Sequence, residues 1–149
     1  MKDLKKKWDK LTTGWFGTVI YIFLGFLLAF GLMQILGLAF NSATPVVAVF
    51  SESMIPVLQK GDMLFVYNNG DYKVGDIVVY YTTHKPYPII HRIIEINGDM
   101  VRTRGDHNSI ADPWETPISS IYGKTSLKLP LLGWVKIVFT EITGISGFV

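Results

Sequence analysis

The chain has 149 residues and no cysteine. Disulfide bonds, zinc sites with thiolate ligands and a cysteine nucleophile are therefore excluded, and the sequence leaves the redox compartment open. Histidine is scarce as well, because the chain contains three. A search for an imidazole base near neutral pH therefore has three candidates.

Charge is absent from one long stretch, which runs from Leu11 through Ser51. Residues 13–40 are apolar and exceed the roughly 20 residues that a bilayer core requires. A cleaved signal peptide is disfavoured, because its apolar core usually has about 7 to 15 residues and the only candidate cleavage site, Asn41 to Thr44, is weak. The sequence predicts one transmembrane anchor over residues 13–40.

The first ten residues carry a net charge of +3, from five lysines and two aspartates, and contain no arginine. A basic tail that runs directly into an apolar segment is more typical of the cytoplasmic flank of an anchor than of a nucleic-acid-binding arm. We therefore expect a cytoplasmic tail over residues 1–12 and a single-pass protein. Residues 41–149 should form a domain outside the cytoplasm or in a lumen.

Beyond the anchor, short apolar runs alternate with Gly, Pro, Asn and Asp, a pattern typical of strands. Strands are expected at residues 46–50, 63–67 and 77–81, and Asn97-Gly98 predicts a two-residue hairpin turn. The length leaves room for one domain beside the anchor. The predicted fold class is a mainly β catalytic domain with one N-terminal transmembrane helix.

The segment 127–149 is apolar again. A second crossing is disfavoured, because Lys136 and Glu141 would lie in mid-membrane and prolines and glycines interrupt the run. We expect a strand or short helix apposed to the membrane, with Trp134 at headgroup depth. A core strand followed by a frayed tail is the alternative.

Ser53 follows the strand-like run at 46–50, and Pro56 turns the chain soon after it. Such a junction can hold a hydroxyl outward, which makes Ser53 a candidate nucleophile. Serine is a weak nucleophile and needs an adjacent base. The alternative is a turn serine that hydrogen-bonds its own backbone.

The three histidines differ in their surroundings. His84 lies in a polar loop with prolines, and His107 lies in a turn. His91 interrupts a β-branched run, where an imidazole must find a buried partner or line a cleft. His91 is therefore the candidate base, with a purely structural strand histidine as the alternative.

Two acids are candidates for orienting His91. If Asn97-Gly98 is the hairpin loop, His91 faces Arg104, and Asp106 lies on the same-face diagonal within reach of the imidazole. Asp112 follows in a loop that could fold back over the same site. Spacing alone favours Asp106 and leaves Asp112 open.

Taken together, SESMIPVL after a single anchor, GDIVVY, IIHRII and RGDHNSIAD resemble type I signal peptidase in its archaeal and endoplasmic-reticulum form. The resemblance covers residues 1–135 and implies a β fold like that of signal peptidases. It implies Ser53 as the nucleophile and His91 as the general base, where the bacterial branch carries lysine. The pattern G-D-x-x-x-x-x-D matches Asp106 and Asp112 and implies Asp112 as the triad acid, with Asp106 in a supporting role.

The resemblance also implies the groups around the nucleophile. Ser51 and the backbone N–H of Ser53 would bind the oxyanion, where one donor is worth about 2.7 to 4 kcal/mol of barrier. Met54 would wall a substrate pocket. Glu52 departs from the family, in which glycine is common at that position.

The implied activity is a membrane-bound serine endopeptidase that cleaves N-terminal signal peptides from exported preproteins, with no metal or cofactor. Its implied partners are preproteins and the lipid bilayer, with a translocation channel or accessory subunits as further candidates and no nucleic acid. Two alternatives stay open. One is an anchored serine protease that cuts other surface precursors, and the other is a non-enzymatic β-domain adaptor or scaffold.

Overall fold

A computed structural model describes residues 13–143. The predicted basic tail at 1–12 and the last part of the apolar segment, residues 144–149, lie outside the described residues. The chain divides between Leu36 and Gly37 into two compact units.

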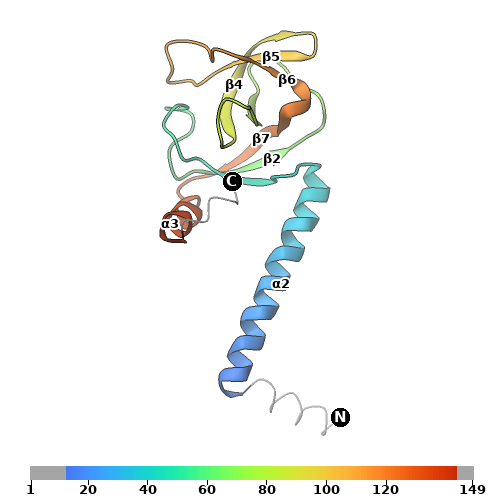
Figure 1. The fold of residues 1–149 in the computed structure, drawn as a ribbon, viewed down its shortest axis with the longest axis vertical. Helices are drawn as coiled ribbons and strands as arrows, with labels where there is room; N and C mark the ends of the chain where they lie inside the picture. Colours follow the sequence, from blue (N-terminus) through green and yellow to red (C-terminus); the bar gives the residue numbers. More distant parts are fainter. Residues whose placement is uncertain (1–12, 144–149) are drawn as a thin grey trace. The chain divides into compact units, whose positions relative to one another are not determined.

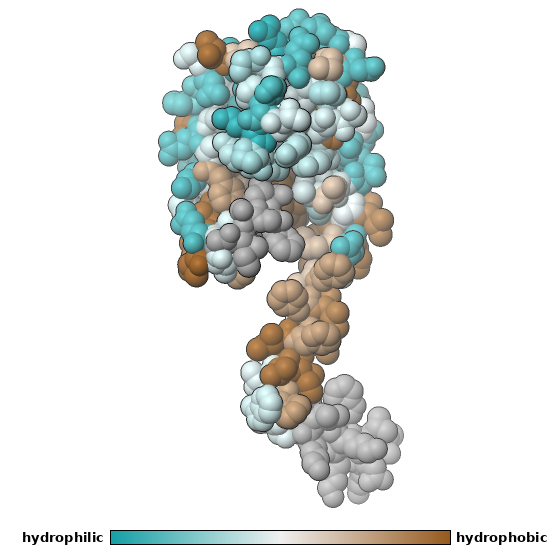
Figure 2. Space-filling view, viewed as in Figure 1, coloured by the Kyte–Doolittle hydropathy of each residue, from teal (hydrophilic) through white to brown (hydrophobic). Residues whose placement is uncertain are grey.

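Helix α2 spans Gly14–Phe40 and lies within the predicted anchor. It is long and apolar enough to cross a membrane, and no other helix in residues 13–143 is. Its 27 residues correspond to about 40 Å at the usual rise, against about 30 Å for a bilayer core. Apolar side chains follow the helix along its length (Figure 2) and most are exposed. Such a helix requires an apolar environment.

The unit that begins at Gly37 contains one seven-stranded antiparallel sheet (Figure 1) with the order β1-β2-β7-β3-β4-β5-β6. The mainly β fold class is confirmed. The last strand, β7, pairs with β2 on one side and β3 on the other. The strands are β1 (Val46–Ala48), β2 (Met63–Tyr67), β3 (Ile77–Tyr80), β4 (Ile89–Asn97), β5 (Met100–Arg104), β6 (Glu115–Pro117) and β7 (Ile121–Leu129).

Two buried apolar clusters stabilise this sheet. There are two because neighbouring residues of a strand point to opposite faces of the sheet. Val79 belongs to one cluster, whereas Val78 and Tyr80 belong to the other. The first cluster includes Met54 and Leu58, which follow the candidate nucleophile. Each fully buried apolar side chain contributes about 1.5 to 3 kcal/mol.

The β4–β5 hairpin differs from the predicted turn. Strand β4 continues through Asn97, which pairs with Met100, so the turn is Gly98-Asp99. Gly98 has a φ of 60°, as glycine at the first position of a tight hairpin turn allows. The prediction of an Asn97-Gly98 turn is therefore wrong by one residue.

With the Gly98-Asp99 turn alone, Arg104 would face Ile93. A register shift between Ile93 and Glu95 moves the pairing back by one residue, so Arg104 faces Arg92 and not His91. The predicted pairing of His91 with Arg104 is wrong, and so is the diagonal that brought Asp106 to the imidazole. A bulge inserts an extra residue into one strand and changes what each later residue faces.

The apolar segment after residue 127 is the end of β7 followed by helix α3, Trp134–Thr143. Ile137 is buried, and α3 packs against β1. Trp134 covers Gly61, which has a φ of 94° and no room for a Cβ beneath the indole ring. Glycine is required there by conformation and by space.

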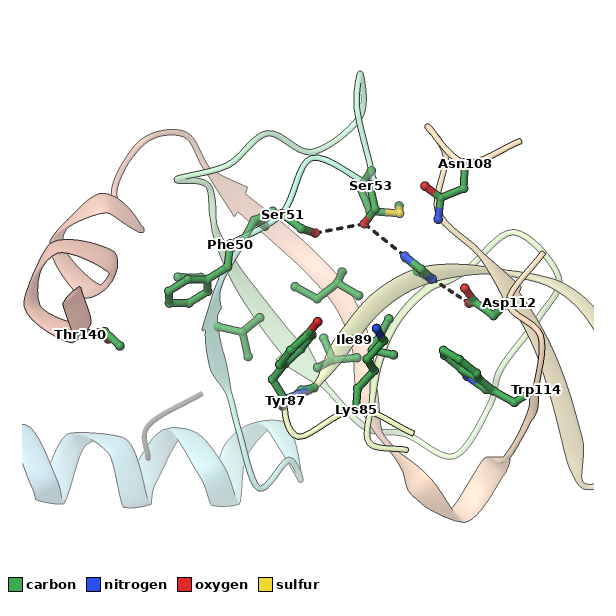
Figure 3. Close-up of a pocket in the computed structure, with 18 residues that line it drawn as sticks. Phe50, Ser51, Ser53, Lys85, Tyr87, Ile89, Asn108, Asp112, Trp114 and Thr140 are labelled. Atoms are coloured by element: carbon green, nitrogen blue, oxygen red, sulfur yellow. Dashed lines mark hydrogen bonds and ion pairs between the residues drawn. The ribbon is translucent and has the colours of Figure 1, made fainter. Parts of the chain in front are cut away.

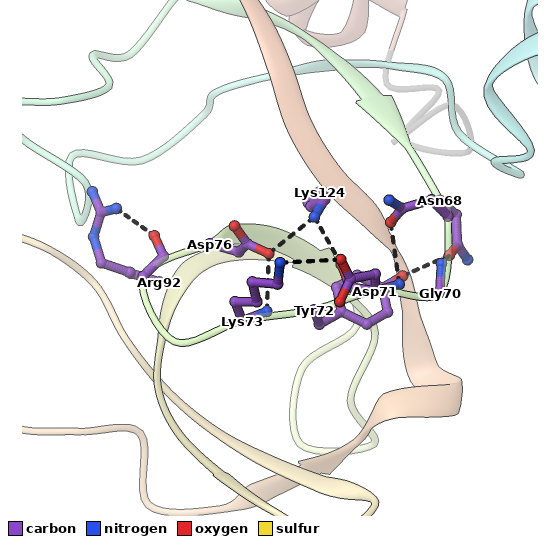
Figure 4. Close-up of polar contacts among 10 residues, drawn as sticks. Asn68, Gly70, Asp71, Tyr72, Lys73, Asp76, Arg92 and Lys124 are labelled. Carbon is purple, nitrogen blue, oxygen red and sulfur yellow. Dashed lines mark hydrogen bonds and ion pairs between the residues drawn. The ribbon is translucent and has the colours of Figure 1, made fainter.

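The connection between β2 and β3 is held by ionic hydrogen bonds (Figure 4). Lys124 Nζ lies 3.2 Å from Asp76 Oδ2 and donates to the Asp71 carbonyl oxygen over 2.7 Å. At the end of this connection, the Gly75 carbonyl oxygen accepts a bond of 2.7 Å from Arg92. The network fixes the loop that precedes β3 against β4 and β7.

Candidate active site

Ser53 lies in the turn-rich segment between β1 and β2. The segment is anchored by Met54, which is 1% exposed, and by Leu58, which is 4% exposed, and Leu58 N–H donates to the Met54 carbonyl oxygen. The buried Met54 side chain faces the core, and Ser53 itself is half-buried. The packing of its neighbours thus holds the Ser53 hydroxyl in a fixed place.

His91 lies on β4, is 7% exposed, and faces Val78 of β3. Its Nε2 lies 3.1 Å from Ser53 Oγ, and its Nδ1 lies 2.7 Å from Asp112 Oδ2. Figure 3 shows this series of contacts, which begins at Ser51 and ends at Asp112. The structure thus brings together four of the residues that the sequence singled out, Ser51, Ser53, His91 and Asp112.

The ionised Asp112 carboxylate determines which atom donates in each hydrogen bond of this series. An ionised carboxylate can only accept, so Nδ1–H of His91 donates to Asp112, and Nε2 of the neutral ring accepts the Ser53 hydroxyl proton. Ser51 Oγ lies 3.1 Å from Ser53 Oγ. Because the one Ser53 proton is directed to the imidazole, the Ser51 hydroxyl is the donor to Ser53.

Asp112 is buried, and its carboxylate accepts three side-chain hydrogen bonds. The donors are His91, Thr103 and Tyr80. Burial by itself raises the pKa of the Asp112 carboxyl, but the hydrogen bonds from these three side chains outweigh burial and leave that pKa below its usual value. Asp112 is therefore an anion throughout the neutral range.

Asp106 has a different partner. Its two carboxylate oxygens accept from Arg92 Nε and a terminal guanidinium nitrogen of Arg92, over 2.8 and 2.6 Å. Arg92 follows His91 on β4 and points to the opposite face of the strand. Of the two predicted acids, Asp112 contacts the imidazole, whereas Asp106 fastens its loop to β4.

A pocket of about 620 Å³ lies at this site. Its lining includes five of the predicted residues: Ser51, Ser53, Met54, His91 and Asp112. Most of the other lining side chains are apolar, including those of Val49, Tyr87 and Ile89. A pocket of this size, with a few convergent polar groups, is typical of a binding site.

Glu52, the residue that departs from the family pattern, is exposed. Among residues 13–143, the non-glycine residues with positive φ are Asn41 and Leu131, so Glu52 has an ordinary backbone conformation. A side chain is therefore tolerated beside the candidate nucleophile without strain.

Among residues 13–143, no hydrogen bond joins the ring of either of the other two histidines to Ser53. His84 stacks on Trp114 with ring centroids 5.0 Å apart. His107 is exposed, and its backbone N–H donates to the Ser53 carbonyl oxygen over 2.8 Å. The contribution of His107 to the site thus comes from its main chain.

Sequence reasoning missed Tyr80, Thr103 and Arg92. Tyr80 ends an apolar strand and Thr103 sits in alternation with Val101, so each carries the weak signal of a polar group at an inward-facing position. The error in hairpin register concerns Thr103, whereas Tyr80 lies on β3 and reaches Asp112 through the pairing of β3 with β4. Arg92 carried a clearer signal, since it directly follows the candidate base.

The chain was compared with known proteins. The family described as signal peptidase, peptidase S26, matches residues 18–126. The signal peptidase complex catalytic subunit SEC11 of Scheffersomyces stipitis is 36% identical, over 85% of this chain and 82% of the relative. The subunit of the same name from Komagataella phaffii is 37% identical, over 76% of this chain and 77% of the relative. The one from Candida albicans is 35% identical, over 76% of each chain.

These matches define the class, and the chain belongs to the peptidase S26 family of signal peptidases, a family of hydrolases. Within that class it is a type I signal peptidase of the endoplasmic-reticulum branch. Both statements agree with the resemblance seen in the sequence.

Proposed function

We propose that this chain is a membrane-anchored serine endopeptidase that cuts N-terminal signal peptides from exported preproteins. The observation that carries the proposal is the hydrogen-bonded series of Ser51, Ser53, His91 and Asp112 at an apolar pocket. The relatives are named catalytic subunits of a signal peptidase complex, which supports the same reaction here.

In the first step, Ser53 Oγ bonds to the carbonyl carbon of the scissile peptide while its proton passes to His91 Nε2. The imidazole becomes positively charged, and the Asp112 carboxylate at 2.7 Å stabilises that charge. The carbonyl oxygen becomes an oxyanion. The Ser51 hydroxyl, whose proton would turn from Ser53 Oγ to the oxyanion, and the Ser53 backbone N–H are the donors that we assign to it.

In the second step, His91 gives its proton to the nitrogen of the leaving chain as the C–N bond breaks, and the signal peptide remains as an ester on Ser53. A water molecule then attacks this ester, and its proton passes to His91. The ester bond breaks, the proton returns to Ser53 Oγ, and the signal peptide leaves with a new carboxylate.

The substrate would bind in extended form. Strand β1 lies at the edge of the sheet, and a peptide can pair with such an edge as an added strand. The pocket beside it has Met54 in its wall. We expect small residues at the first and third positions before the cut.

Membrane anchoring is part of the proposal. Helix α2 would cross the bilayer with the lysine-rich tail in the cytoplasm and the β domain outside the cytoplasm or in a lumen. Helix α3 would lie against the bilayer surface, since Val135, Phe139 and Ile142 are all more than half exposed. Quenching of Trp134 fluorescence by brominated lipid, in a variant whose other tryptophans are phenylalanine, tests this apposition; unquenched fluorescence would contradict it.

The test of the function is incubation of the purified chain with a labelled preprotein in detergent, followed by sequencing of the new amino terminus. The wild type should release the mature chain with a single new terminus, and Ser53→Ala should leave the preprotein intact. The names of the relatives point to a complex, so the assay is repeated with membranes that supply accessory subunits. Absence of cleavage in both settings would refute the proposal and favour the adaptor or scaffold alternative.

The rival protease function predicts a different preference. A surface precursor without a signal peptide is offered in competition with the preprotein. Preferential cleavage of that precursor would favour the rival.

A further inference from the structure

We propose that Tyr80 and Thr103 are positioning residues of this reaction: their hydroxyls hold the Asp112 carboxylate where it accepts the Nδ1–H of His91. The proposal rests on the proposed function, because it gives Asp112 a part in the reaction. It adds two residues from two further strands to the site.

The strand order brings these residues together. Strand β4, with His91, lies between β3, which ends at Tyr80, and β5, which carries Thr103. His91 faces Val78, two residues before Tyr80, and Thr103 faces Ile93, two residues after His91. Residues two apart share a face of a sheet, so all three side chains lie on one face, with Tyr80 and Thr103 each diagonal to His91.

The contacts converge on one carboxylate oxygen. Asp112 Oδ2 lies 2.5 Å from Thr103 Oγ1, 3.0 Å from the Tyr80 hydroxyl and 2.7 Å from His91 Nδ1. The two hydroxyl oxygens are themselves 2.9 Å apart. Tyr80 and Thr103 are 0% exposed, so water does not compete for these bonds.

The hydroxyl protons of Tyr80 and Thr103 are sufficient in number if the Asp112 carboxylate is ionised. Three close oxygen contacts join Tyr80, Thr103 and Asp112, and the two hydroxyls supply two protons, both of which an ionised carboxylate can accept. Burial raises the pKa of the Tyr80 phenol, so its proton stays in place as a donor. Hydrogen bonds from the two hydroxyls and His91 hold the pKa of Asp112 below its usual value despite burial.

The hydroxyls have a role that the main chain does not fill. The Asp112 backbone N–H donates to the Thr103 carbonyl oxygen over 2.9 Å, so the loop stays attached to β5 when a side-chain hydroxyl is removed. Loss of either hydroxyl therefore removes one of the three side-chain donors that orient the carboxylate and leaves the Asp112 backbone in place. The expected effect is on orientation of the imidazole.

The chain offers matched variants. Thr103→Val removes the hydroxyl and keeps the side-chain volume, whereas Thr103→Ser keeps the hydroxyl and removes a methyl group. Tyr80→Phe removes the second hydroxyl. Thr116→Val is the control, because Thr116 is 2% exposed, lies on the neighbouring strand β6, and has a buried hydroxyl without a hydrogen-bond partner.

Each variant is assayed on the full chain in detergent with a labelled preprotein. We expect Thr103→Val and Tyr80→Phe to lower kcat by about 10- to 100-fold, the range for one hydrogen bond to a charged group, with KM nearly unchanged. Thr103→Ser should recover most of the loss, and Thr116→Val should match the wild type. In an Asp112→Ala background, Thr103→Val should change kcat less than about twofold, because the group it acts through is gone.

Three results would overturn the proposal: equal losses in Thr103→Val and Thr103→Ser, a Thr116→Val loss as large as that of Thr103→Val, or an undiminished Thr103→Val effect in the Asp112→Ala background. Each would mean that Thr103 acts through packing.

A second measurement needs no turnover. The Nδ1–H proton of His91 is followed by NMR in the inactive Ser53→Ala chain and assigned by its absence from His91→Gln. We expect its downfield signal to move in Thr103→Val and Tyr80→Phe and to stay in place in Thr116→Val; no movement in either hydroxyl variant would contradict the proposal. If the wild type cleaves nothing but this signal moves, the proposed function fails while the hydroxyl network stands.

Discussion

The backbone N–H of His107 donates to the carbonyl oxygen of Ser53 over 2.8 Å. This bond ties the loop that leads to Asp112 directly to the residue that we assign as nucleophile. Gly105 lies at the start of the loop, where an added Cβ would be 2.5 Å from the same carbonyl oxygen and 3.0 Å from His91 Nε2. The loop thus approaches both residues too closely for a side chain at position 105.

Gly105→Ala should therefore lower kcat strongly. The methyl group must push the loop away from Ser53, and a displacement of about 1 Å in a catalytic group can cost about 100-fold in rate. The measurement is kcat on a labelled preprotein beside a melting curve of the same variant. Wild-type kcat in a folded Gly105→Ala chain would show that the close approach is unimportant.

Ser53→Ala and His91→Ala should each reduce cleavage by about 10⁴-fold or more, because nucleophile and base act as a unit. The double variant should be no worse than either single variant. Circular dichroism of all three checks that the fold is intact. Near-wild-type cleavage by one single variant would remove that residue from the mechanism.

The two aspartates should separate by their effects. Asp112→Asn should lower kcat by about 10⁴-fold through loss of the imidazole's orientation. Its effect on the melting temperature should be smaller than that of Asp106→Asn. Asp106→Asn should instead lower the melting temperature, because it weakens a paired hydrogen bond to Arg92 worth about 1.5 to 3 kcal/mol. If Asp106→Asn is inactive with unchanged melting and Asp112→Asn is active, the assignments must be exchanged.

Part of this site could be predicted from the sequence, because some signals are local. Strand Met63–Tyr67 is found as predicted. His91 differs from the other histidines because it interrupts a β-branched run, which is visible in the sequence. Asp112 lies 21 positions from His91, and the fold brings the two together. No local signal joins them, so only the resemblance to a family indicates Asp112 as the acid.

What could not be predicted depends on register. The bulge between Ile93 and Glu95 has no reliable sequence signature, and together with the displaced turn it changes which residue faces His91. The turn at Gly98-Asp99 competes with Asn97-Gly98, and both are acceptable hairpin turns. Tyr80 and Thr103 belong to the site through pairing of three strands, which is a property of the sheet and not of any short segment.

The stability of the chain should depend on Asp112 at acid pH. The hydrogen bonds of the folded state, acting against burial, place the pKa of Asp112 below its usual value, which is about 3.9 in an unfolded chain. Its ionised form therefore stabilises the fold at pH values above the unfolded pKa, and this contribution is lost as pH falls through the folded pKa. Asp112→Asn lacks the contribution at every pH.

Melting temperatures of the wild type and Asp112→Asn, measured in detergent from about pH 6 to 3, test this dependence. The two curves should approach each other as the pH falls. A difference that is constant or grows toward acid pH would mean that Asp112 is not held as an anion in the fold.

Strand β7 joins the two parts of the sheet, and within residues 13–143 it is made after the other six strands. Strands β1 and β2 flank the segment with Ser53, whereas His91 and Asp112 belong to the part that contains β3 to β6. A ribosome that has completed residue 117 has made all three side chains but not the strand that unites their supports. The proposed hydrolysis depends on this set and should therefore begin only when residues 121–129 have left the ribosome, so we expect a nascent chain that stops before β7 to be inactive.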